Sequence, residues 1–238
     1  MKKSINHHIN NLPAIAVLIA LIGFSGLSSP KAQAQQVDFG ADMVNRYVWR
    51  GLDFGNAASI QPGIEFSQGG FTVGTWASYA MSPVSAGASE LDLYASYNFG
   101  AVSIGLTDYY FPNAGVGFFD FSDDGGAHIL EPSLSFNGTE NIPITLYAAI
   151  NAYNDPDNSI YIEAGVPFSV QETDLQLFAG FVPAESAYYA TTKAAVTNIG
   201  LSVQKELTIT ENFSLPLFSS YILNPYSETS FLVFGFSL

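Results

Sequence analysis

Apolar and small or polar side chains alternate along this chain in segments of about ten residues. The segment 91–99 has Leu, Leu, Ala, Tyr and Phe at every second position, and the segment 160–168 has Ile, Ile, Ala, Val and Phe. A period of two puts such side chains on one face of a β-strand, whereas helical spacing would scatter them around a cylinder. The alternation therefore predicts strands with one apolar face and one polar face.

The composition indicates what the apolar faces would contact. Hydrophobic residues make up 48% of the chain and charged residues only 12%, against about 25% charged in typical soluble domains. Beyond residue 34 no apolar run is longer than six residues, the length of Phe231–Phe236, and a membrane-spanning helix needs about 18 or more. High apolar content that is spread by alternation is typical of a transmembrane β-barrel.

We therefore expect an all-β fold, a transmembrane antiparallel up-and-down β-barrel of about twelve strands. The strands are expected to begin near Val37, Ser59, Phe71, Ser89, Ala101, His128, Pro143, Ser159, Asp174, Lys193, Phe213 and Ser227. Tight turns at Gln68–Gly70 and Asn98–Gly100 alternate with longer loops at Gly51–Ala58, Ser82–Ala88, Pro112–Ala127, Asn154–Asn158 and Pro183–Thr192. This alternation matches the periplasmic and extracellular ends of an outer-membrane barrel, with both termini periplasmic. A soluble β-sandwich with an aromatic-rich core is the alternative.

The N-terminal segment resembles an export signal. Lys2 and Lys3 precede an apolar stretch from Leu12 to about Leu27, and Ala32-Gln33-Ala34 forms an A-x-A cleavage site. We expect residues 1–34 to be a cleaved signal peptide and residues 35–238 to be a single outer-membrane barrel domain. An uncleaved anchor helix is the alternative.

Charge and residue types exclude several classes of function. Residues 35–238 carry four basic and 21 acidic side chains, a formal net charge of −17, which excludes a basic footprint for nucleic acid. The chain has no cysteine, and His128 is the only histidine after residue 34. Thiolate metal sites, cysteine nucleophiles and most histidine-based catalysis are thereby excluded, so we expect no catalytic residue, no cofactor and no metal.

One face of the expected strands is apolar and is assigned to lipid. It comprises Phe71, Leu93, Ile104, Leu134, Leu146, Ile162, Leu177, Leu201, Leu215 and Phe234, and the only charge on it is Asp108, near a loop end. Aromatic residues near the strand ends predict two interfacial girdles: Tyr47, Trp49, Tyr79, Phe99, Tyr110, Phe168, Phe213 and Tyr221.

The opposite face is expected to line a narrow water-filled lumen. Its candidate lumen or constriction residues are Arg46, Arg50, Glu65, Asp92, Glu131, Glu163, Trp76 and Tyr94. Glycine recurs on this face, where it leaves room for a neighbouring aromatic ring. The interpretation places Arg46 on the first strand, about opposite Gly63 and diagonal to Glu65. These charges form either structural ion pairs or a field that selects solutes.

Two loops are acidic, Phe119–Gly126 and Asn154–Asn158. Oxygen-rich loops are able to hold calcium, but neither loop has EF-hand spacing, so solvated surface loops are the competing interpretation. Phe118, Phe119 and Phe121 belong to the longest loop and would either constrict the lumen or face a partner.

The segments Asn45–Gly51, Ser59–Gly63 and Gly70–Ser78 resemble the opening of the TorF-type porins, outer-membrane proteins of Gram-negative bacteria. The match is specific over residues 45–78, and beyond them it rests on length, strand number and the final strand, Tyr226–Leu238. The resemblance implies a β-barrel with a channel role. It supplies no catalytic residue and no known solute.

We therefore expect a porin-like passive diffusion channel for small solutes or ions in the cell outer membrane, and not an enzyme. The expected partners are outer-membrane lipid, the barrel assembly machinery and small solutes or ions, without nucleic acid. The acidic surplus favours cations or neutral solutes. A non-conducting barrel that serves as a scaffold or binding surface is the main alternative. An outer-membrane lipid hydrolase that uses His128 is a further one.

Overall fold

The structure is a computed structural model that describes residues 35–82, 89–112, 115–123 and 125–238. Its strands are β1 (Gln36–Val44), β2 (Val48–Trp49), β3 (Leu52–Asp53), β4 (Ser59–Gln68), β5 (Phe71–Ala80), β6 (Glu90–Asn98), β7 (Val102–Tyr110), β8 (His128–Phe136), β9 (Thr145–Ile150), β10 (Ile160–Val170), β11 (Thr173–Val182), β12 (Ala195–Thr210), β13 (Phe213–Asn224) and β14 (Thr229–Ser237). The expected signal peptide lies outside the described residues. Among those that are described, we find no helix long and apolar enough to cross a membrane.

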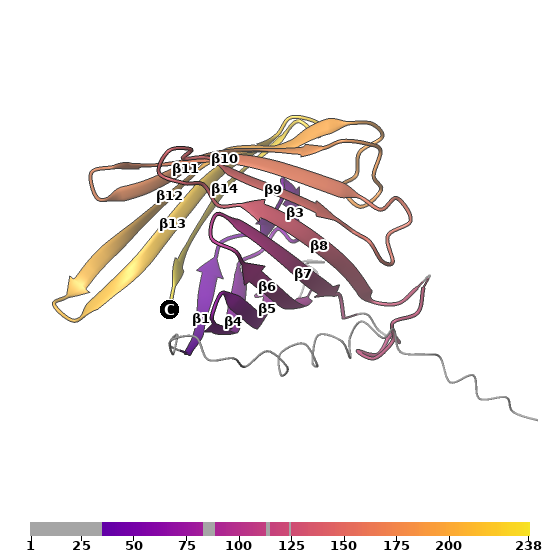
Figure 1. Ribbon diagram of the computed structural model, residues 1–238, viewed down its shortest axis with the longest axis horizontal. Coiled ribbons are helices and arrows are strands. Elements are labelled where there is room, and N and C mark those ends of the chain that lie inside the picture. The colour runs from indigo at the N-terminus through magenta and orange to yellow at the C-terminus, as the bar shows by residue number, and fades with distance from the viewer. Residues whose placement is uncertain (1–34, 83–88, 113–114, 124) are drawn as a thin grey trace, which may run out of the picture. The chain divides into compact units, whose positions relative to one another are not determined.

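Twelve of the strands form one closed antiparallel barrel in the order β1-β14-β13-β12-β11-β10-β9-β8-β7-β6-β5-β4 (Figure 1). β1 pairs with β14, which closes the barrel, and with β4, because β2 and β3 lie between them in the sequence but outside the barrel sheet. Every other barrel strand pairs with the next barrel strand along the chain. The all-β barrel prediction is confirmed, with each strand starting within two residues of its expected position. A closed single sheet also replaces the two packed sheets of the sandwich alternative.

The turns differ at the two ends of the barrel, as expected. Gly69 and Gly70 connect β4 to β5 with φ angles of 61° and 84°, a combination that a type I′ hairpin turn requires and that glycine adopts without strain. At the opposite end, residues 111–127 and 183–194 form long connections. Gln36 pairs with Ser67 beside the short Gly69–Gly70 turn, so β1 starts at the short-turn end.

Period-two alternation separates an outward face from the lumen. On β10, Ile160, Ile162 and Val166 are 39–46% exposed, whereas Tyr161 between them is 1% exposed. Seven of the ten residues assigned to lipid are exposed outside the barrel: Leu93, Ile104, Leu134, Leu146, Ile162, Leu177 and Phe234. Phe71, Leu201 and Leu215 are half-buried. The outward face of the barrel thus carries an apolar band.

Glycines on the lumen face lie beneath aromatic rings. A Cβ at Gly180 would collide with the Tyr161 ring, and a Cβ at Gly200 would collide with the Phe178 ring. The same relation holds for Gly74 beneath Tyr94 and for Gly235 beneath Phe218. The absence of a side chain at these glycines therefore leaves room for large aromatic rings inside the barrel.

Two polar side chains, Asp108 and His128, interrupt the apolar outer face of the barrel. Asp108 and His128 pair across β7 and β8, with 2.8 Å between Nδ1 and Oδ1. The 111–127 connection covers them, since Phe118 accepts a hydrogen bond from His128 and Phe121 stacks on its ring at 3.9 Å. Phe118 and Phe121 thus fold onto the outer wall rather than into the lumen, and Phe119 remains 85% exposed.

Candidate functional site

One side of the lumen carries carboxylates on β1, β4 and β6, which we name the acidic wall: Asp38, Asp42, Glu65, Glu90 and Asp92. Asp38 lies directly opposite Glu65 in the β1–β4 register. The Tyr94 hydroxyl donates a 3.0 Å hydrogen bond to Glu65, and Gln36 donates one to Asp38. No salt bridge joins these five carboxylates to a cation in the described part of the chain.

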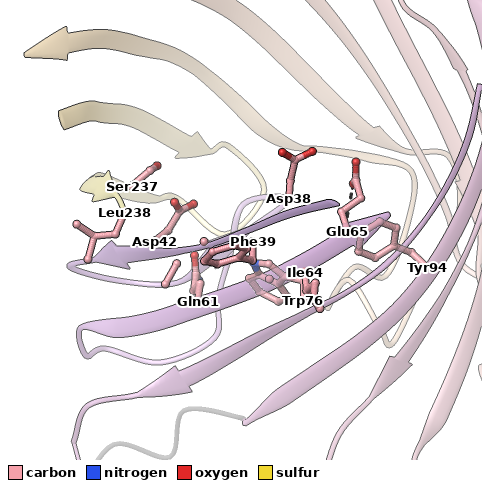
Figure 2. Close-up of a pocket in the computed structure, with 13 residues that line it drawn as sticks. Asp38, Phe39, Asp42, Gln61, Ile64, Glu65, Trp76, Tyr94, Ser237 and Leu238 are labelled. Carbon is pink, nitrogen blue, oxygen red and sulfur yellow. Dashed lines mark hydrogen bonds between the residues drawn. The ribbon is translucent and has the colours of Figure 1, made fainter. Parts of the chain in front are cut away.

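A cavity of about 320 Å³ opens beside three of these carboxylates at the short-turn end, and the exposed Phe39 and Ile64 also line it (Figure 2). Carboxylates of Asp38, Asp42 and Glu65 line it together with the rings of Trp76 and Tyr94. Three candidates predicted from the sequence, Glu65, Trp76 and Tyr94, are therefore brought together. Negative charge without a basic partner makes this cavity favourable for a cation and unfavourable for an anion.

Deeper along the same wall, Glu90 and Asp92 are buried next to each other on β6, at 2% and 7% exposure. Oε2 of Glu90 and Oδ1 of Asp92 have no hydrogen-bond partner among the described residues. Tyr47 lies against this pair. Burial raises the pKa of the Tyr47 hydroxyl well above its ordinary value, and the negative charges of Glu90 and Asp92 raise it further.

The connection between β1 and β4 contains a hairpin that the sequence interpretation missed. β2 pairs with β3 through Val48↔Asp53 and Trp49↔Leu52, which leaves Arg50 and Gly51 as a two-residue turn. Their φ angles are 50° and 81°, both positive, as a type I′ turn requires. We name residues Val48–Asp53 the plug hairpin.

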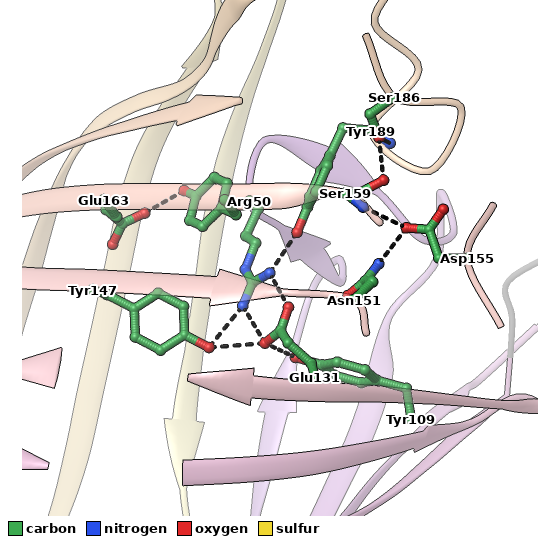
Figure 3. Close-up of polar contacts among 11 residues, drawn as sticks. Arg50, Tyr109, Glu131, Tyr147, Asn151, Asp155, Ser159, Glu163, Ser186 and Tyr189 are labelled. Atoms are coloured by element: carbon green, nitrogen blue, oxygen red, sulfur yellow. Dashed lines mark hydrogen bonds and ion pairs between the residues drawn. The ribbon is translucent and has the colours of Figure 1, made fainter. Parts of the chain in front are cut away.

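The plug hairpin crosses the lumen rather than extending from β1. Its Arg50 reaches Glu131 on β8 and Tyr147 on β9, strands on the far side of the barrel from β1 (Figure 3). The Gly51 carbonyl accepts a hydrogen bond from Asn224 on β13. A Cβ at Gly51 would collide with the backbone of Thr197 on β12, so glycine permits this close approach.

Arg50 and Glu131 form a bidentate ion pair inside the barrel. The Nη1–Oε2 distance is 2.6 Å and the Nη2–Oε1 distance is 2.8 Å, which is the fork geometry that makes arginine–carboxylate pairs strong and directional. Side-chain exposure is 9% for Arg50 and 1% for Glu131. Burial alone would lower the pKa of Arg50, but the hydrogen bond to Glu131 and the charge interactions with Tyr189, Tyr109 and Glu131 together outweigh burial and raise the pKa above its ordinary value.

Tyrosine hydroxyls complete the surroundings of this pair. Glu131 accepts hydrogen bonds from Tyr109 at 2.9 Å and from Tyr147 at 2.8 Å, and Arg50 donates to Tyr189. Burial raises the pKa of Tyr189 above its ordinary value, so the group stays a neutral phenol beside the ion pair. A buried charge pair is stable only when such partners satisfy it.

Aromatic rings fill the space around the tip of the plug hairpin. The Arg50 guanidinium lies 4.1 Å from the Trp49 ring centroid and 4.5 Å from that of Tyr161, within the range of cation–π attraction. Trp49 stacks on Tyr189, which in turn stacks on Tyr161, and Tyr188 meets Trp49 edge-on. Tyr188 and Tyr189 come from the connection between β11 and β12, so two loops meet inside the barrel.

The remaining candidates lie apart from the acidic cavity. Glu163 accepts hydrogen bonds from Tyr161 and Asn198 on the plugged side. Arg46 forms a salt bridge with Asp53, at 3.4 Å, and a hydrogen bond with Asn56, both within its own loop.

Two predictions about this region were wrong. Arg46 and Arg50 are not on the first barrel strand, because β1 ends at Val44 and the chain turns inward. Arg46 is therefore not opposite Gly63, which pairs with Gly40 instead. Tyr47 and Trp49 do not belong to an interfacial girdle, since both rings pack inside, Tyr47 against Trp76 and Trp49 against Tyr189.

The acidic loop at Asn154–Asn158 uses its carboxylates to hold the backbone. Asp155 accepts hydrogen bonds from the Asn151 side chain and from the amides of Asp157 and Ser159. The Asp157 carboxylate accepts one from the amide of Ala187. In the ranges that the structure describes, no group of three or more His, Cys, Asp or Glu side chains is arranged to hold a metal ion.

The two acidic loops nevertheless meet at the loop end of the barrel. Asn154 donates hydrogen bonds to the carbonyls of Gly126 and His128, and Tyr153 donates one to Phe121. A second cavity, of about 750 Å³, opens between them and is lined by Asp123, Ile129, Tyr153 and Asp155 among others. Phe54, which follows the plug hairpin, stacks on Phe111 of this cavity at 6.5 Å. The plug hairpin thus adjoins the mouth of the barrel.

Comparison with known proteins places the chain in one family. A search of curated proteins finds no match. A family model described as a bacterial protein of unknown function, Gcw_chp, matches residues 28–214, which is more than half of the chain and includes the plug hairpin and most of the barrel. The chain therefore belongs to the Gcw_chp family of bacterial proteins.

Proposed function

We propose that this protein is an outer-membrane barrel that acts as a narrow, porin-like passive channel for small cations or neutral solutes. The observation that carries the proposal is the cavity lined by Asp38, Asp42 and Glu65 inside a closed barrel. A polar lumen within an apolar outer band is the arrangement that allows a barrel to cross a lipid bilayer and hold water.

Electrostatics supports the preference for cations. Carboxylates on a lumen wall of low dielectric constant attract cations and repel anions, as rings of acidic side chains do in cation channels. The one arginine that reaches across the lumen, Arg50, is already neutralised by Glu131. The field in the lower cavity is therefore set by the acidic wall.

The location follows from the same proposal. Residues 1–34 would direct export and be removed, and the barrel assembly machinery would insert the rest, with the short turns and both chain termini on the periplasmic side. The resemblance of residues 45–78 to TorF-type porins supports this assignment. That the protein is not an enzyme stays a prediction.

A non-conducting barrel is the second candidate, and the plug hairpin favours it. The hairpin lies between the mouth cavity and the far wall, with Arg50 and Trp49 packed among buried tyrosines. If it never moves, the barrel presents loops and an outer surface but passes little solute.

Planar-bilayer recording of the purified barrel separates the two candidates. A channel of the proposed kind gives discrete conductance steps and, in a salt gradient, a reversal potential that favours cations. Replacement of Glu65 by Gln removes one lumen charge and keeps the side-chain shape, so cation preference should fall. Silent barrels that are correctly folded would contradict the channel, and anion preference would contradict the role of the acidic wall.

A further inference from the structure

We propose that the plug hairpin is a gate, latched by the Arg50–Glu131 pair and released as a unit while the barrel wall stays closed. This inference deepens the proposed channel and rests on it for the conductance readout. The release itself concerns only the hairpin and the wall, and it is measurable without any channel activity.

The hairpin is free of the barrel's own hydrogen-bond ladder. β2 pairs only with β3, in a separate two-stranded sheet, and neither strand joins the twelve of the barrel. Side-chain contacts of Trp49 and Arg50 hold the tip, together with the hydrogen bond from Asn224 to the Gly51 carbonyl. Withdrawing the hairpin therefore breaks no barrel strand pair.

The latch favours two discrete states over a gradual opening. Buried charges separated by a small displacement would each lose their partner without gaining water, which is the least favourable arrangement. The pair is stable either fully docked, with Glu131 held by Arg50, Tyr109 and Tyr147, or fully withdrawn with both charges hydrated. Such bistability is the property that a gate needs.

The base of the hairpin is held together by contacts that travel with it. Arg46 pairs with Asp53 across the base, and the Phe54 amide donates a hydrogen bond to the Tyr47 carbonyl. Gly55 follows with a φ of 150°, so the chain bends between the hairpin and β4. The hairpin is therefore fastened internally at its base and bound to the wall at its tip. Its base also contacts the wall, since Tyr47 packs against Trp76 and Arg46 lies over the Phe231 ring.

Withdrawal would open the plugged side of the lumen. Trp49 and Arg50 would leave the space between Tyr109 on β7, which Trp49 meets edge-on at 5.6 Å, and Tyr161 on β10, whose ring centroid lies 4.5 Å from the Arg50 guanidinium. The mouth cavity would then connect with the cavity that Asp38 and Glu65 line. The permeating cation would pass along a wall whose carboxylates lack a cationic partner.

Trypsin reports the position of the hairpin directly, because Arg50 is itself a cleavage site. In the folded barrel Arg50 is buried against Glu131 and should be cut slowly. The Glu131→Gln variant keeps the shape of the side chain but removes the charge of the latch, and we expect cleavage after Arg50 to accelerate about tenfold or more. Glu206→Gln, a change at an exposed carboxylate of β12, is the matched control and should cleave at the wild-type rate.

The Arg50→Lys variant is the second test, since it keeps both the positive charge and a trypsin site but loses the two-point fork. Cleavage at residue 50 should rise in this variant as well, although less than in Glu131→Gln. Heat-modifiable migration in gels and the circular dichroism of the barrel verify that each variant is folded. In bilayers, both variants should conduct more than the wild type.

The outcomes separate the gate from the channel. Faster cleavage in both latch variants with an unchanged control supports release, even if no variant conducts; in that case the hairpin moves but the proposed channel fails. Unchanged cleavage in folded Glu131→Gln and Arg50→Lys barrels would overturn the gate, whether or not the wild type conducts.

Discussion

The two sides of the lumen treat charge in opposite ways. On the side formed by β8–β10 and β12, Glu131 and Glu163 each accept hydrogen bonds, and Arg50 of the plug hairpin pairs with Glu131. On the acidic wall, Asp38, Asp42 and Glu65 line a cavity, and no described cation forms a salt bridge with them. The same residue type is thus structural where a loop satisfies it and available to solutes where no loop reaches it.

This contrast explains why few basic side chains pair with carboxylates in a chain with 21 acidic residues. Arg50 pairs with Glu131, which is buried beside the tip of the plug hairpin, and Arg46 pairs with Asp53 at the base of the hairpin. Additional cations on the acidic wall would cancel the field that we assign to solute selection. Five of the 21 acidic residues thus lie on one side of the lumen, and no described cation forms a salt bridge with them.

The largest loss of stability should come from removing the ion pair between Arg50 and Glu131 on the plugged side. Replacement of Arg50 by Ala leaves Glu131 without its ionic partner, and removal of one partner of a buried pair destabilises a protein by about 3–5 kcal/mol. We expect the lower end, about 3 kcal/mol, because release of the hairpin lets water reach Glu131. Urea unfolding of the barrel in detergent measures the loss, and a change close to zero would show that the latch contributes little.

A smaller loss is expected where an aromatic ring of the same side lies over a glycine. An added methyl at Gly180 would push Tyr161 away from Glu163 and Arg50, and overpacking of this kind destabilises by about 1–3 kcal/mol. Gly117→Ala is the matched control, because a Cβ there meets no atom within 4 Å. Equal melting temperatures for the two variants would contradict the tight packing of the plugged side.

Substitution of a carboxylate in the acidic wall should change ion selectivity rather than the stability of the barrel. Glu65→Gln removes a charge that faces the cavity, and we expect the ratio of cation to anion permeability to fall about two- to fivefold. Glu163→Gln should change the ratio less, since Tyr161 and Asn198 already engage that carboxylate. Reversal potentials in a salt gradient give both ratios. A larger change in Glu163→Gln would reverse the contrast between the two sides.

The barrel was predictable from sequence, and the plug was not, for physical reasons. Alternation such as Ile160, Ile162 and Val166 against Tyr161 is local and reports each strand directly. Alternation breaks after Val44, where the polar Asn45 and Arg46 are followed by the apolar Tyr47, Val48 and Trp49. Such a break does not report where the chain goes next. A two-residue X-Gly turn between apolar residues was the signal for a hairpin there.

Contacts between distant segments remained out of reach of the sequence. Tyr189 meets Arg50 only because the connection between β11 and β12 also folds inward. Asp38 and Glu90 carry no motif, and they were missed because their importance comes from register: Asp38 lies opposite Glu65, and Glu90 lies next to Asp92. The candidate residues Glu65, Trp76, Asp92, Tyr94, Glu131 and Glu163 lie on barrel strands, whereas Arg46 and Arg50 were assigned to the first strand and lie in the connection that follows it.

The smallest loss of stability is expected at Arg46, which lies four positions before Arg50 in the sequence. Arg46 and Asp53 keep 27% and 25% of their side chains exposed, and ion pairs of this kind contribute about 0–1 kcal/mol. Arg46→Ala should therefore lower the free energy of unfolding by less than about 1 kcal/mol, and conductance should stay close to that of the wild type. Because the Phe54 amide still binds the Tyr47 carbonyl, the base of the hairpin survives the change. A loss as large as that of Arg50→Ala would mean that the base, and not the tip, holds the plug in place.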